Sequence, residues 1–173
     1  CGVILGEQIE VDDIAYPMPF SVVASDDLKN LEQVDYAAGA ATPYFETQTV
    51  AEHFANVLGK LRTASLLDTT ILRIEEAWQS NQQSGTGYDR ILINHSAFYE
   101  STELNVEFKN AFEVLESLCS QFGLRIFHQD GRFVAQSLSA ASDSPTSVSY
   151  SDIDSSGVVT QNTITRPNMI PGD

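Results

Sequence analysis

The chain has 173 residues, of which 42% are hydrophobic, and a formal net charge of -15 at pH 7. This length suits one domain or one and a half, and the apolar content is that of a globular chain. Nine Lys and Arg stand against 24 Asp and Glu, so we expect neither specific nucleic-acid binding nor attraction to anionic membranes. No apolar run approaches the roughly 20 residues of a membrane span.

The chain begins at Cys1 rather than at a methionine, and we interpret it as a piece of a longer polypeptide. Cys1 and Cys119 are the two cysteines. Their separation gives neither a disulfide framework nor a zinc-binding spacing. We expect Cys119 to be a small buried hydrophobic residue of a helix.

Two strands are predicted near the N-terminus. Residues 3–11 alternate between apolar and polar side chains in their second half, the period of a strand. Residues 16–24 contain Pro17 and Pro19, whose missing N–H groups fall on one side and indicate an edge strand. Ser25-Asp26-Asp27 then offers a cap for one short helical turn.

The first predicted helix follows a loop at residues 37–45. Thr49 and Glu52 have the spacing of a capping box, in which each side chain satisfies a free N–H group of the first turn. Lys60 and Arg62 are expected in the last turn, where the helix dipole favours cations. The apolar face consists of Val50, Phe54, Val57, Leu58 and Leu61.

The middle of the chain alternates short strands with loops. Residues 69–78 are predicted to be a strand because apolar and polar positions alternate, although part of this run would also tolerate a helix. Residues 81–87 are predicted to be a loop, and residues 90–94 and 104–108 to be short strands.

The second predicted helix leads into a β-hairpin. Asn110 is the candidate cap with Glu113 three residues later, and Gly123 is placed to end the helix in the left-handed conformation. Asp130-Gly131 separates two apolar runs, a strong hairpin signal because both turn positions require positive φ. The apolar stripe of the helix consists of Phe112, Leu115, Leu118, Cys119 and Phe122.

After residue 138 the sequence becomes rich in serine. We therefore divide the chain into an α+β domain at residues 1–138, built of strands, hairpins and two amphipathic helices, and a segment at 139–173. That segment is either a linker or a set of strands, such as 158–160 and 163–165, that complete a sheet outside the chain.

The chemistry-bearing residues form no motif, and we therefore expect a protein that is not an enzyme and that has no cofactor and no metal. Three histidines are scattered, and we expect His53 and His128 at the surface or at its boundary. Adjacent acidic residues point to opposite faces of a strand and make no catalytic pair. The aromatic residues Trp78, Tyr88, Phe98 and Tyr99 could form a sugar-binding platform, although core positions are the commoner role for such residues.

Two segments resemble phage tail-hub and baseplate-hub proteins and the related type VI secretion spike proteins. Phe45-Glu-Thr-Gln-Thr-Val-Ala-Glu52 is similar to the start of the first helix in that family, with Gln48 where glycine is frequent. The segment 110–133, a helix that leads into a hairpin with an Asp-Gly turn, looks like its second signature. Residues 16–31 are similar to the elements that precede the first helix in phage tail-tip proteins. The resemblance spans about residues 16 to 138.

The resemblance implies a structural component of a phage tail tip or baseplate hub, present in the virion and assembled in the host cytoplasm. It would form a trimeric ring of copies of itself and connect the tube to the spike or fibres through neighbouring tail proteins. An acidic lumen would repel passing DNA within about 8–10 Å. The residues expected to hold the fold are Thr49, Glu52, Phe54, Leu58, Phe112, Leu115, Leu118, Phe122, Gly123, Asp130 and Gly131.

Two other functions stay open. One is a carbohydrate- or receptor-binding module of a tail or surface protein, which would need an exposed aromatic platform at Trp78 or Tyr88. The other is a peptidoglycan-cleaving domain, supported only by the number of carboxylates.

Overall fold

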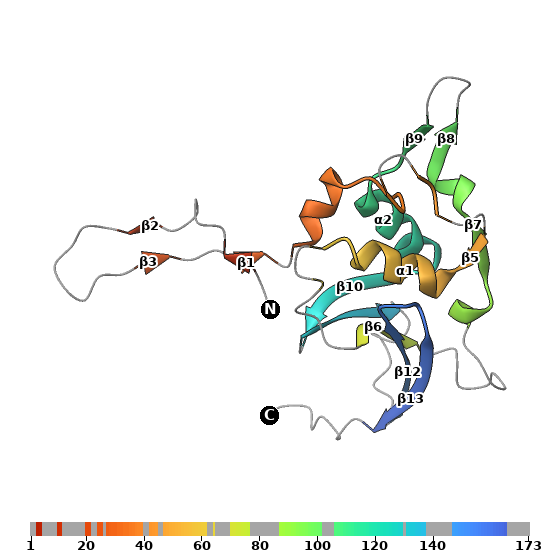
Figure 1. Cartoon of the computed structure of the whole chain (residues 1–173). Helices are drawn as coiled ribbons and strands as arrows, with labels where there is room; N and C mark the ends of the chain where they lie inside the picture. The colour runs from red at the N-terminus through yellow and green to blue at the C-terminus, as the bar shows by residue number, and fades with distance from the viewer. Residues whose placement is uncertain are drawn as a thin grey trace.

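The structure is a computed structural model of the whole chain (Figure 1). The residues that it describes are 3–4, 10–11, 20–21, 24–25, 27–39, 42–44, 47–61, 64, 70–76, 87–101, 106–129, 131–137 and 147–165.

A five-stranded mixed sheet forms the base of the fold. Its order is β10-β11-β6-β12-β13, and β6 is the central strand. The β11–β6 pair is parallel and the other pairs are antiparallel. The bounds are Thr70–Glu76 for β6, Leu124–Gln129 for β10, Arg132–Ser137 for β11, Ser147–Asp154 for β12 and Val159–Thr165 for β13.

Two α-helices cover one face of this sheet, α1 at Val50–Leu58 and α2 at Ala111–Gln121 (Figure 1). Each begins with a complete capping box, made by Thr49 and Glu52 in α1 and by Asn110 and Glu113 in α2. Each capping box satisfies two N–H groups that a helix start would otherwise leave unpaired.

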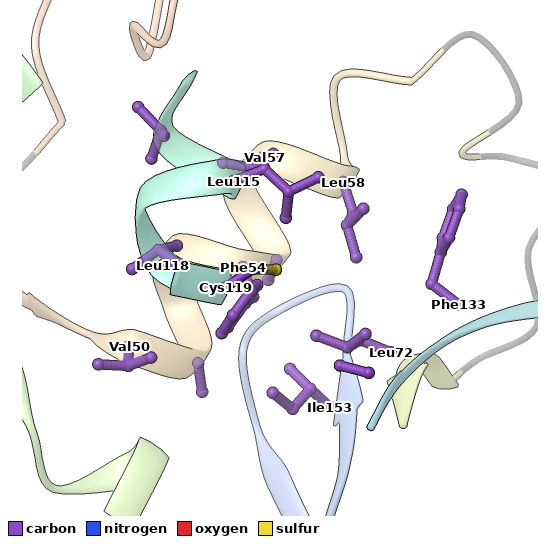
Figure 2. Close-up of a cluster of buried hydrophobic side chains, with 14 of the residues drawn as sticks. Val50, Phe54, Val57, Leu58, Leu72, Leu115, Leu118, Cys119, Phe133 and Ile153 are labelled. Atoms are coloured by element: carbon purple, nitrogen blue, oxygen red, sulfur yellow. The ribbon is translucent and has the colours of Figure 1, made fainter. Parts of the chain in front are cut away.

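The core lies between the helices and the sheet (Figure 2). Side chains alternate across a strand, and the register aligns Leu72 of β6 with Phe133 of β11 and Ile153 of β12. These three side chains are fully buried, as are Phe54 of α1 and Leu118 of α2. Burying a large apolar side chain stabilises the fold by about 1.5–3 kcal/mol, so this layer is the main source of stability.

Shorter elements surround the helices. β5 pairs with β7 and β8 with β9, both antiparallel, and near the N-terminus β1 pairs with β4 and β2 with β3. The bounds are Val3–Ile4 for β1, Glu10–Val11 for β2, Phe20–Ser21 for β3, Ala24–Ser25 for β4, Thr47–Thr49 for β5, Leu92–Asn94 for β7, Tyr99–Ser101 for β8 and Val106–Phe108 for β9. The 3₁₀ helices are η2 at Leu28–Gln33, η5 at Gly87–Asp89 and η6 at His95–Phe98.

The α+β class is confirmed, together with both helices, their caps and the hairpin. Gly123 ends α2 with a φ of 60°, and Gly131 sits in the hairpin turn with a φ of 79°. The run that could have been a helix, residues 69–78, forms strand β6 in its described part. Among the described residues, no helix is long and apolar enough to cross a membrane.

Three expectations are corrected. The strands after residue 138 pair inside this chain, because β12 lies directly beside β6. Residues 147–165 are therefore not a linker, and they complete the sheet of this chain rather than one outside it. Lys60 lies beyond the end of α1 and donates instead to the carbonyl of Ala37 at 2.6 Å. Asp27 precedes η2 in the left-handed conformation without a side-chain cap, and its carboxylate accepts a bond from the Asn30 side chain.

Candidate functional site

Several of the residues expected to hold the fold lie in the core. Phe54, Leu58 and Leu118 are fully buried, and Leu115 is almost so. Phe112 and Phe122 are only half-buried at the margin of the core. In contrast, Ala111 and Val114 of α2 are fully buried. The stripe of α2 is therefore rotated toward Ala111 and Val114. Asp130 lies outside the described residues, as do Phe45, Glu46, Arg62, Pro17, Pro19 and Trp78.

The sheet face opposite the helices carries a polar network. The register places Arg73 beside Asp152, and their side chains form two hydrogen bonds of 2.8 and 3.1 Å. The guanidinium also lies 3.9 Å from the ring centroid of Tyr150, a cation–π geometry. The hydrogen bond to Asp152 raises the pKa of Arg73, so this guanidinium stays charged.

The neighbouring row of the same face continues the network over three strands. Arg125 of β10 donates to the side-chain carbonyl of Gln136 on β11, and the Gln136 amide donates to Glu75 of β6 at 3.1 Å. Two guanidinium groups thus lie near two carboxylates, those of Glu75 and Asp152. In this part of the described chain the outer sheet face has balanced charge, and it does not match the expected acidic lumen.

The two edges of the sheet differ in their side chains. β13 reads Val-Thr-Gln-Asn-Thr-Ile-Thr, with neither a charged residue nor a proline, and residues 160–163 are exposed. Natural edge strands usually carry charges, prolines or bulges that prevent another strand from pairing. Within the described residues β13 has one partner, β12, so its outer edge is chemically suited to accept a further strand. The other edge, β10, carries Arg125.

A second cluster lies inside the fold, where α1 meets the segment from β7 to β9. We call it the histidine cluster; it consists of Tyr36, Tyr44, His53, His95, Phe98, Tyr99 and Phe108, whose rings contact one another.

His53 is fixed by two hydrogen bonds. The Tyr36 hydroxyl is 2.6 Å from its Nδ1, and Nε2 is 3.1 Å from the carbonyl oxygen of Ile93. Since a carbonyl only accepts, Nε2 carries the proton and Nδ1 accepts from the hydroxyl. Burial lowers the pKa of His53 and raises that of Tyr36, so both groups are neutral near pH 7.

His95 is buried without such partners. Its side chain is 1% exposed, and neither ring nitrogen has a hydrogen-bond partner. Its ring stacks parallel to that of His53, with an angle of 7° and 6.4 Å between centroids. Burial, and then the neighbouring His53, lower the pKa of His95, and the Tyr36 backbone opposes this with a smaller effect.

The expectation that His53 is a surface or boundary residue was wrong. His53 follows Val50 by three residues and precedes Val57 by four, so helical spacing places it on the apolar face; that signal could have found it. Nothing in the local sequence marks Tyr36 or His95, because long-range packing brings them to His53. His128 is half-buried in β10, at the boundary as expected.

Other chemical expectations can be placed on the structure. Tyr88 and Phe98 are buried, so neither can contribute to an exposed sugar-binding platform. Cys119 is buried, and burial raises its thiol pKa to about 11. Among the described residues, no group of three or more His, Cys, Asp or Glu side chains could hold a metal ion.

Comparison with known proteins gives no relative for this chain: no protein-family model, no curated protein and no solved structure matches it.

Proposed function

We propose that this chain is a structural, non-enzymatic module of the phage tail-hub type. It would assemble with copies of itself and with neighbouring tail proteins in the virion, and it would help connect the tail tube to the spike or fibres.

One observation carries the proposal. The described parts of the two main segments that resemble hub proteins, the capped start of α1 and the unit formed by α2, β10 and β11, are far apart in sequence but belong to one core. Phe54 of α1 and Leu118 and Cys119 of α2 lie side by side in that core, above Leu72 of the sheet (Figure 2). This shared core supports the proposal, because both segments then belong to one packed unit.

The sheet topology is compatible with a ring of copies. β13 runs parallel to β6, while β10 runs in the opposite direction. In a ring whose axis follows the strands, β13 of one copy would meet β10 of the next in antiparallel orientation. Head-to-tail contacts of this kind close into rings when the rotation permits, and the uncharged edge of β13 allows the pairing.

The charge distribution indicates which side of such a ring would be acidic. Exposed carboxylates lie on η2 and just after it, on α2 and on the β8–β9 ribbon, and they outnumber the exposed Lys29 and Lys109 of the same region. They are Glu32, Asp35, Glu100, Glu107, Glu113 and Glu116. The outer sheet face instead pairs Arg73 with Asp152. An acidic, DNA-repelling surface would thus be formed by the helical side.

Self-association tests the proposal. Sedimentation velocity over a wide concentration range should show a concentration-dependent oligomer, and negative-stain electron microscopy should show rings. The double variant Thr160→Lys, Asn162→Lys places two charges on the exposed side of β13 and should shift the protein to monomer. Ser120→Lys, Gln121→Lys is the matched control, since it adds the same charge at exposed positions of α2.

A full-length protein that is monomeric at every concentration would contradict the hub assignment. Loss of the oligomer in both double variants would instead contradict the role of β13, because charge alone would then explain the effect.

A further inference from the structure

His95 occupies a buried, aromatic site that favours a neutral imidazole over a charged one. The rings of Tyr36, Tyr44 and Tyr99 lie with their centroids 5.1–5.4 Å from that of His95. Phe98 and Phe108 lie slightly farther away. A protonated His95 would hold a charge out of water. Neither ring nitrogen meets hydrogen-bond geometry, and the Tyr36 backbone favours the charged form less than burial disfavours it, so protonation is costly in this interior.

His53 responds differently to a proton. Its Nε2–H bond to Ile93 would remain, and a protonated Nδ1 could donate to the Tyr36 hydroxyl, which can accept as well as donate. The Glu52 carboxylate also favours the charged form of His53, although burial is the larger effect. A charge on His53 would further disfavour one on His95, because the two rings are stacked.

The other titratable groups around His95 cannot compensate its charge. Tyr36, Tyr44 and Tyr99 face it from the segment after η2, from the following loop and from β8. Burial raises the pKa of both Tyr36 and Tyr44, so they provide no phenolate. Lys60, 5.7 Å from the ring centroid of Tyr44, is the nearby cation.

The segment that carries His95 is held by short ribbons. β7 pairs with β5 through three residue pairs and β8 pairs with β9 through three. Phe98, between them, accepts a backbone bond from Lys109 at 2.9 Å. Segments with few such ties open locally at lower free energy than the central sheet.

We propose that the stacked pair of His53 and His95 is an acid-sensitive latch, which holds the segment Leu92–Ser101 against α1 and Tyr36 when both rings are neutral and releases it when His95 is protonated. The inference rests on the fold alone and does not depend on the proposed function.

The sign of the pH dependence follows from the lowered pKa values. The opened segment binds a proton near the ordinary histidine value of about 6.5, and the closed segment binds it only at lower pH. The latch is therefore fully closed above about pH 6.5 and weakens as the pH falls below that value. Each histidine that takes up a proton on opening increases the opening equilibrium by up to about tenfold per pH unit.

Hydrogen–deuterium exchange at pH 7.5 and at steps down to pH 5 tests this. After correction for intrinsic rates, exchange in residues 92–101 should rise by up to about tenfold per unit below pH 6.5 for each proton bound, while β6 and β11 stay protected. H95F fills the place of His95 in the histidine cluster with a ring that does not titrate. It should lower the steepness of the pH dependence of exchange by about one proton. H128Q, which removes a half-buried histidine of β10, should leave the wild-type profile.

Two results would overturn the latch: exchange in 92–101 that is independent of pH, or wild-type steepness in H95F. If H95F does not fold, histidine NMR on the wild-type protein decides. A His95 ring that titrates only together with loss of amide protection supports the latch, and one that titrates near 6.5 with protection unchanged overturns it.

Discussion

Gly157 lies in the β12–β13 turn and packs against the first turn of α1. Replacing it with alanine would test how closely the turn and the helix are packed. Its φ is 80°, and a Cβ atom built there would lie 2.7 Å from Cγ and 2.8 Å from Cα of Glu52. Gly131 has nearly the same φ, 79°, but an added Cβ would meet nothing within 4 Å. The two glycines therefore differ in close contact and not in backbone conformation.

This difference in close contacts predicts different losses of folding free energy for the two alanine variants. Left-handed backbone costs alanine about 1–2 kcal/mol at either position. The lower entropy of the unfolded alanine chain offsets about 0.4–1 kcal/mol of this cost in both variants. Only Gly157→Ala adds an overlap with the Glu52 backbone, and overpacking costs about 1–3 kcal/mol. We therefore expect the free energy of unfolding of Gly157→Ala to be about 1–3 kcal/mol lower than that of Gly131→Ala.

Urea unfolding followed by circular dichroism measures both variants. The midpoint should fall further for Gly157→Ala at an unchanged slope. Equal losses in the two variants would refute the reasoning, since they would mean that the turn moves away from α1 at no cost.

Three further predictions follow from single contacts. Thr49→Ala removes the hydroxyl that accepts from the Glu52 N–H at 3.1 Å and should lower the free energy of unfolding by about 1 kcal/mol; an unchanged urea midpoint would contradict the capping role. Leu118→Ala leaves a cavity between α2 and α1 and should cost about 2–5 kcal/mol, whereas the exposed Glu116→Ala should unfold near the wild-type midpoint. Cys119, with its thiol pKa raised to about 11 by burial, should resist iodoacetamide at pH 8 in the folded protein and react in denaturant; peptide mass spectrometry would show the difference, and rapid labelling of the folded protein would mean that the thiol is accessible.

Local signals in the sequence determined the elements whose causes are local. Capping boxes and helical spacing predicted α1 and α2, because a helix start is decided by residues three or four apart. The Asp-Gly pair predicted the hairpin, because the turn conformation depends on its own residues. The caps and the hairpin pairing follow these local rules.

Only the tertiary structure decided which strands become neighbours and which polar groups become buried. The Ser-rich end of the chain supplies β12 and β13, and their place beside β6 depends on burying Ile153 under the helices rather than on a local preference. His53 and His95 are 42 residues apart, yet their rings stack inside the fold. Local sequence rules carry no information about such a long-range contact, because packing free energy depends on which distant surfaces come together.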